Sequence, residues 1–142
     1  MLPIVLDSRS TGMYVPDGYG TMFPYICVAD APAYLQFLQQ AFGARELGRT
    51  VMPDGEIANA RVRIGDTSFM VGSAREGIEP TSSAFYLYVE DADAAFRAAL
   101  ANGAAPISEP ADMPYGDRQA GITDPAGNIW WISARFLHQP YD

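Results

Sequence analysis

The sequence predicts an α+β fold made of two βαβββ modules, one in each half of the 142-residue chain. The first observation is a repeat. Val28-Ala29-Asp30-Ala31 matches Val89-Glu90-Asp91-Ala92 at an offset of 61 residues, and Gly43-Ala44 matches Gly103-Ala104 at an offset of 60. The second observation is the order strand, helix, strand, strand, strand, which the hydrophobic periodicity gives in both halves. The near-constant offset favours a duplication over an ordinary α+β domain with two unrelated helices.

The first module is predicted over residues 23–72, after an N-terminal extension over residues 1–22. An apolar strand at 23–28 leads to Asp30, a residue type that often caps a helix N-terminus, and a helix is expected from there to Gly43. Apolar residues recur along this segment at helical spacing. Three strands are expected next, at about 46–52, 57–64 and 67–72.

The second module is predicted over residues 84–135, between a linker at 73–83 and a tail at 136–142. A strand at 84–89 precedes Asp91, the expected N-cap of a second helix that ends at Gly103. The segment Asp124-Pro125-Ala126-Gly127-Asn128 is typical of a tight turn and leads into an apolar strand. The strands of this half are expected near 105–108, 118–123 and 128–135.

Composition excludes several classes of function. The net charge of −8 argues against nucleic-acid binding, which needs clustered positive charge. All nine basic residues are arginines, so no lysine is available for a Schiff base or a P-loop. The single cysteine, Cys27, fits a reducing compartment, and no apolar run is long enough to span a membrane. We therefore expect a soluble cytoplasmic protein.

Several short motifs, in their order and spacing over residues 16–134, resemble the vicinal oxygen chelate superfamily of glyoxalases, bleomycin-resistance proteins and dioxygenases, and more narrowly its PhnB-like branch. The resemblance implies that each module forms a curved sheet, that the two sheets form a cleft with the helices outside, and that the chain is a homodimer. The matching motifs are Pro16-Asp17-Gly18-Tyr19, Pro24-Tyr25-Ile26, Ala41-Phe42-Gly43-Ala44, Pro53-Asp54-Gly55, Arg63-Ile64-Gly65-Asp66, Tyr88-Val89-Glu90-Asp91-Ala92-Asp93-Ala94, Gly116-Asp117-Arg118 and Asp124-Pro125-Ala126-Gly127-Asn128.

The positions that carry metal ligands in this superfamily hold other residue types in this sequence. By resemblance they fall at Phe23, at or beside Ala84, at Trp131 and near 70–72. Relatives of the PhnB-like branch often carry histidine where this chain has Asn59 and Asn128, and asparagine is a poor ligand for transition metals. We therefore expect no metal and no other cofactor.

Strand alternation predicts which side chains face the cleft. Ala58, Ala60, Val62 and Ile64 should pack toward the helix, and their alternates should face the cleft. The loop before the seventh strand should border it, with Asp117 and Arg118 as acid–base candidates or as a local salt bridge. The predicted ligand-binding residues are Phe23, Tyr25, Asn59, Arg61, Arg63, Tyr86, Tyr88, Tyr115, Asp117, Arg118 and Trp131.

Two functions follow from this cleft. The aromatic lining suits a flat or cationic organic molecule, and the arginines suit an anionic group on it. The first hypothesis is therefore metal-independent binding of a small molecule, as in bleomycin-resistance proteins. The second is an enzyme of the glyoxalase or dioxygenase group, a lyase or oxidoreductase with an atypical site. The aromatic residues could instead fill a closed cleft or a dimer interface. The sequence does not identify catalytic residues.

Overall fold

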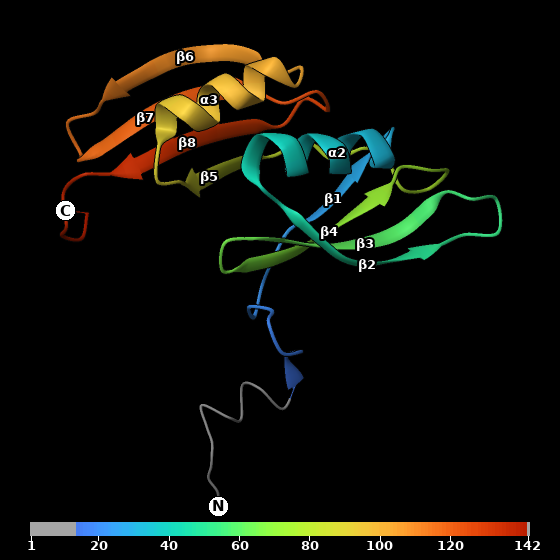
Figure 1. Cartoon of the computed structure of the whole chain (residues 1–142). Coiled ribbons are helices and arrows are strands. Elements are labelled where there is room, and N and C mark those ends of the chain that lie inside the picture. The colour runs from blue at the N-terminus through green and yellow to red at the C-terminus, as the bar shows by residue number, and fades with distance from the viewer. Residues whose placement is uncertain (1–13, 142) are drawn as a thin grey trace, which may run out of the picture.

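A computed structural model describes residues 14–141 of the chain (Figure 1). Residues 1–13, most of the predicted N-terminal extension, and Asp142 lie outside the described residues. The first half contains β1 (Tyr25–Val28), α2 (Ala31–Phe42), β2 (Arg45–Val51), β3 (Ile57–Ile64) and β4 (Thr67–Ser73). The second half contains β5 (Ala84–Tyr88), α3 (Ala92–Ala101), β6 (Ala105–Asp112), β7 (Asp117–Thr123) and β8 (Ile129–Arg135).

The two halves have the same topology. Their strand orders are β1-β4-β3-β2 and β5-β8-β7-β6, so the first and last strands of each module are neighbours. These neighbours run parallel, whereas the remaining pairs are antiparallel. The predicted fold of two βαβββ modules is confirmed.

Both helices begin at the predicted caps. A side-chain oxygen of Asp30 accepts a hydrogen bond from Ala33 N at 3.1 Å, and Asp91 accepts one from Ala94 N at 3.0 Å. Each bond satisfies a backbone N–H that has no partner within the helix. The duplication is thus visible in equivalent capping residues as well as in strand order.

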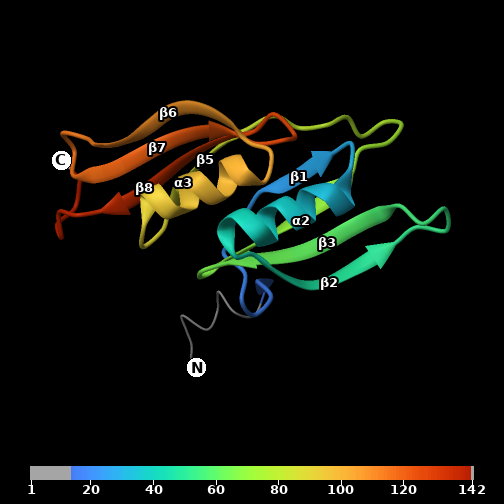
Figure 2. The same ribbon diagram turned by 45° about the horizontal axis from the view of Figure 1, so that its top comes forward.

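The hydrophobic core lies between each helix and its sheet. Alternate strand residues such as Val62 and Ile132 are almost fully buried against the helices. The helices α2 and α3 lie next to each other in both views, each over its own sheet (Figures 1 and 2). Phe42 of α2 and Trp130 of β8, with ring centroids 4.8 Å apart, join the two modules through an aromatic contact.

A buried polar network also joins the modules. Asp124, in the turn before β8, accepts hydrogen bonds from the Tyr34 hydroxyl of α2 at 2.6 Å and from the Trp130 Nε1 at 2.8 Å. Its other carboxylate oxygen accepts from the backbone N–H groups of Ala126 and Asn128. Burial and then the negative charge of Asp124 raise the pKa of Tyr34, so this phenol remains a donor at neutral pH.

Two local details differ from the sequence expectation. The strand β6 continues to Asp112, four residues beyond its predicted end, although it contains prolines; it lies at a sheet edge, where a missing N–H is tolerated. At the start of β3, Ile57 rather than Ala58 is in the core. A register shift between Thr50 and Val51 interrupts the alternation there and turns Ala58 away.

Candidate ligand-binding site

The face of each sheet that points away from the helices is called the inner face below. On the second sheet this face is aromatic. Tyr86 and Tyr88 of β5 are 48% and 52% exposed, while Phe85 and Leu87 between them pack against the core, as the alternation predicts. Large aromatic side chains exposed side by side are unusual on a protein surface and are typical of binding sites.

Trp131 of β8 lies flat on this inner face because the neighbouring strand carries a glycine. A Cβ atom at Gly121 of β7 would lie 2.5 Å from the Trp131 ring. The indole therefore occupies the space that any other residue would fill. Trp131 and Tyr86, together with Gln119 and Met113, line a hollow of about 530 Å³.

A buried carboxylate lies at the end of the same face. Asp117, the first residue of β7, is fully buried and accepts hydrogen bonds from the Tyr86 hydroxyl and, at 2.5 Å, from the Tyr141 hydroxyl of the C-terminal tail. Arg135 of β8 forms an ion pair with it at 3.1 Å. Burial alone would raise the pKa of Asp117, but the two phenols and the guanidinium outweigh it and leave that pKa below its ordinary value.

Beside this carboxylate, four tyrosine rings surround a second hollow of about 460 Å³, lined by Tyr86, Tyr88, Tyr115 and Tyr141. We call it the tyrosine pocket. The Tyr115 hydroxyl donates to Gln119 Oε1 at 2.5 Å, and the Tyr88 and Tyr141 hydroxyls contact each other. The rings are thus oriented by a contact between two of them and by hydrogen bonds to the neighbouring Asp117 and Gln119.

The inner face of the first sheet is polar by comparison. The Tyr25 hydroxyl donates to Ala58 O, and Asn59 Nδ2 lies 3.1 Å from Met70 Sδ. Two arginines of β3 project from the same face: Arg61 donates to Thr50 Oγ1 and Asn59 Oδ1, and Arg63 to Gly18 O and Ser68 Oγ. Among residues 14–141, neither guanidinium has a carboxylate within 4.0 Å.

Two of the predicted cleft residues lie elsewhere. Phe23 precedes β1, so strand alternation does not govern it, and its ring packs against the core and lies 5.1 Å from the Tyr19 ring. Arg118 of β7 points to the helix side, where it forms ion pairs with Asp93 at 2.6 Å and Asp112 at 3.1 Å. Arg118 and Asp117 therefore point to opposite sides of the sheet and form no salt bridge with each other.

The residues of the inner faces do not fit the metal site that the superfamily often carries. On the first inner face the amide of Asn59 and the thioether of Met70 lie together, and both are weak ligands for a divalent ion. On the second, both oxygens of the Asp117 carboxylate are already engaged by Tyr86, Tyr141 and Arg135. Asn128 is fully buried, where its Oδ1 accepts from Ser83 N and its Nδ2 donates to Tyr34. In residues 14–141 no three His, Cys, Asp or Glu side chains gather into a possible metal site.

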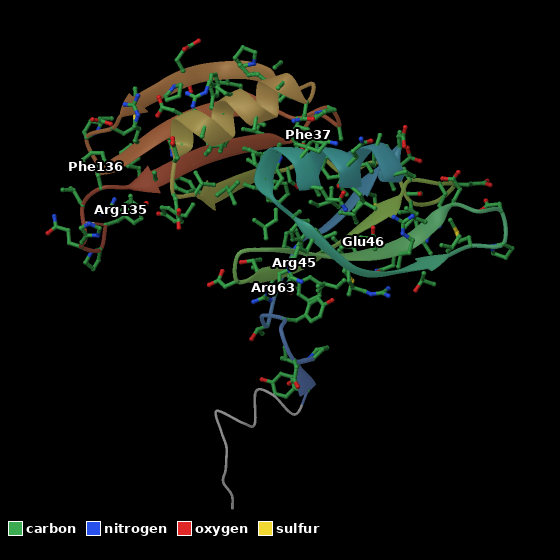
Figure 3. The ribbon with its side chains drawn as sticks, viewed as in Figure 1. Phe37, Arg45, Glu46, Arg63, Arg135 and Phe136 are labelled. Atoms are coloured by element: carbon green, nitrogen blue, oxygen red, sulfur yellow. The ribbon has the colours of Figure 1, made fainter. Side chains whose placement is uncertain are left out.

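Sequence reasoning missed several residues of the second inner face. Gln119 lies between Asp117 and Gly121 in the alternate positions of β7, so its side chain points to the same face. Strand alternation could therefore have identified it. Tyr141 lies in a tail without periodicity, and no sequence signal connects it with Asp117. Figure 3 shows Arg135 and Phe136 where β8 turns into this tail.

None of the helices in the described part of the chain is long and apolar enough to cross a membrane.

Comparison with known proteins identifies the family. The model of the glyoxalase/bleomycin resistance protein/dioxygenase superfamily matches residues 20–132. An uncharacterised protein of Mycobacterium bovis is 34% identical over 118 residues, covering 75% of this chain and 78% of the relative. The crystal structure of TioX from Micromonospora sp. ML1 is similar at a TM-score of 0.69 and 27% identity, covering 83% of this chain and 99% of TioX. A glyoxalase/bleomycin resistance protein/dioxygenase family enzyme from Burkholderia phytofirmans shares the fold at a TM-score of 0.65 and 22% identity, covering 80% of this chain and 96% of that protein. The chain belongs to the glyoxalase/bleomycin resistance protein/dioxygenase superfamily.

Proposed function

We propose that this protein binds a small organic molecule on its aromatic inner face, without a metal ion. The observation that carries the proposal is the hollow of about 530 Å³ between Tyr86 and Trp131. Its volume lies within the range of small-molecule sites, which are mostly apolar with a few polar groups. Gln119 and Glu109 supply such polar groups at its edge.

The site is organised before a ligand arrives. Trp131 is held over Gly121, and Gln119 Nε2 donates to Ser133 Oγ at 2.8 Å while its Oε1 accepts from Tyr115. Side chains that are already fixed lose little conformational entropy on binding. This arrangement supports recognition by stacking on rigid rings.

Binding is favoured over catalysis by the state of Asp117. A general base needs a pKa near the working pH and access to the substrate. Asp117 is fully buried, its pKa is lowered, and both its oxygens are engaged by Tyr86, Tyr141 and Arg135. Such a carboxylate serves better as a fixed charge that positions the tyrosines than as an acceptor of protons.

We further propose that the chain acts as a homodimer in the cytoplasm and belongs to the PhnB-like branch. The branch assignment rests on the short motifs of the sequence. The dimer is supported by apolar surface that one chain leaves open: a crevice of about 230 Å³ between the modules is lined by residues that include the partly buried Ile64, Phe85 and Leu87. A second copy would cover such surface.

The proposal is tested by native mass spectrometry of untagged protein purified without added metal, followed by calorimetric titration of an aromatic compound found bound to it or selected from a small library. We expect Trp131→Ala to weaken binding about tenfold or more, because it removes the stacking surface. Arg118→Ala is the matched control, because this side chain lies on the helix side of the sheet. This variant should bind the ligand with the same affinity as the wild type.

A stoichiometric divalent ion in the native spectrum would contradict the metal-free assignment. Equal affinity of wild type and Trp131→Ala would contradict the placement of the ligand on this face. A library without any binder, together with turnover of a substrate by the purified protein, would support the enzymatic alternative instead.

A further inference from the structure

We propose that the tyrosine pocket binds a planar organic cation, and that the C-terminal tail supplies one of its walls through Tyr141. This inference rests on the proposed small-molecule function and adds to it the charge of the ligand and a residue outside both modules. The pocket's four rings come from β5, from the loop before β7 and from the tail.

The pocket offers ring faces rather than hydroxyl groups. Tyr86, Tyr88, Tyr115 and Tyr141 are each between 41% and 52% exposed, although all four hydroxyls have hydrogen-bond partners within the protein. A ligand rich in hydroxyl groups would find few free partners there. A flat ligand that interacts with π-electrons would find several rings around it.

The hydrogen bonds of the pocket favour a positive charge on that ligand. Tyr86 and Tyr141 both donate to the carboxylate of Asp117. A phenol that donates to an anion gains electron density in its ring, which strengthens the negative potential of the ring face toward cations. The protein already uses this property, because the guanidinium of Arg135 lies 4.1 Å from the centre of the Tyr141 ring.

Arg135 does not compete for the same space. It pairs with Asp117 and lines a neighbouring hollow with Leu137 and Gln139, whereas the described residues that line the tyrosine pocket are all tyrosines. Its charge is balanced by that carboxylate. The net charge of −8 of the whole chain further attracts a cation over longer range.

The tail is held firmly enough to act as a wall. The Phe136 N–H donates to Gly116 O at 3.0 Å, and Arg135 donates to the backbone oxygen of Gln139 at 2.7 Å. The Tyr141 hydroxyl then reaches Asp117 at 2.5 Å. These contacts hold the Tyr141 ring at a defined position beside Tyr88 and Tyr115.

The test compares N-methylquinolinium, a planar cation, with α-methylnaphthalene, its neutral isostere, by calorimetric titration of the full chain. We expect the cation to bind about threefold more tightly, the difference that a cation–π contact provides at a partly exposed site. Tyr141→Ala should weaken binding of the cation by about the same factor, and Tyr141→Phe, which keeps the ring, should weaken it less. Tyr14→Ala is the control, because this exposed tyrosine lines none of the hollows described above.

The remaining outcomes contradict the inference, and each contradicts a different part of it. Equal affinity for the two probes would exclude selection for positive charge. Unchanged binding of N-methylquinolinium by Tyr141→Ala, with loss in Trp131→Ala, would place the ligand in the neighbouring hollow and leave the proposed function intact. If neither probe binds while other aromatic compounds bind wild type and not Trp131→Ala, the tyrosine pocket is not the binding site. If nothing binds at all, the proposed function fails as well.

Discussion

The inner faces of the two sheets differ although the modules behind them are alike. The first face carries two arginines, Arg61 and Arg63, whose hydrogen bonds within residues 14–141 all go to neutral groups. The second carries an array of tyrosines and Trp131 around the buried Asp117. One chain thus presents a basic face and an aromatic face, and on the aromatic face the charge of Asp117 is balanced by Arg135.

The difference shows which parts of a duplicated module are constrained. The core requires apolar residues of fitting size on the helix side, and each helix requires a cap, so Asp30 and Asp91 occur at equivalent positions. No such requirement acts on the inner faces. These residues are therefore free to take up a function, and we propose that in this chain the second sheet carries it.

The largest effect is expected where the two modules are joined. Asp124→Ala would leave the Tyr34 hydroxyl, the Trp130 Nε1 and two backbone N–H groups without their acceptor in the interior. We expect a loss of about 3 kcal/mol in the free energy of unfolding, measured by chemical denaturation. Tyr34→Phe removes one of these bonds and also the bond from Asn128 Nδ2 to the Tyr34 hydroxyl, and it should cost less, about 2 kcal/mol. Equal losses in both variants would contradict the central role of Asp124.

A smaller effect distinguishes the two inner faces through their glycines. A Cβ at Gly72 would lie 2.7 Å from the backbone oxygen of Ala58, which cannot move, whereas at Gly121 it would meet the Trp131 side chain. We expect Gly72→Ala to cost about 2 kcal/mol and Gly121→Ala about 1 kcal/mol of stability. Only Gly121→Ala should also weaken ligand binding, because it displaces the indole. The reverse pattern in calorimetry would place the ligand on the first face.

The smallest effect concerns Asp117 and its dependence on pH. The pKa of this carboxyl is lowered in the folded state, so the unfolded chain takes up its proton first and the stabilisation is lost as pH falls through the folded-state pKa. The wild type should exceed Asp117→Asn by a few degrees in unfolding temperature at neutral pH. This advantage should shrink progressively below about pH 4, the ordinary carboxyl pKa. A constant difference between the two proteins across this range would show that Asp117 acts through packing rather than charge.

The fold could be predicted from the sequence because its signals are local and repeated. The caps Asp30 and Asp91 and the alternation of Phe85, Tyr86 and Leu87 depend on neighbours along the chain. The same alternation assigns Arg118 to the helix side, together with Ala120. The motif Gly116-Asp117-Arg118 suggested instead that Asp117 and Arg118 act together, although adjacent residues of a strand point to opposite faces.

The candidate site was less predictable because it depends on contacts distant in sequence. Tyr141 and Tyr86 meet at Asp117 although 55 residues separate the two tyrosines. Phe23 was assigned by extending the alternation past the start of β1, where the chain is no longer extended in a sheet. Such errors arise at the ends of strands, where periodicity ceases to apply.

The two adjacent tryptophans, Trp130 and Trp131, lie in different surroundings and can therefore report on two parts of the protein by fluorescence. Trp130 is buried in the core with its Nε1 bonded to Asp124, whereas Trp131 is half-buried on the inner face beside a hollow. Indole emission shifts with the polarity of the surroundings, so we expect the two residues to emit at different wavelengths. Emission from Trp130 follows the integrity of the core, and emission from Trp131 follows what occupies the face. A single spectrum can therefore separate unfolding from occupancy without any added dye.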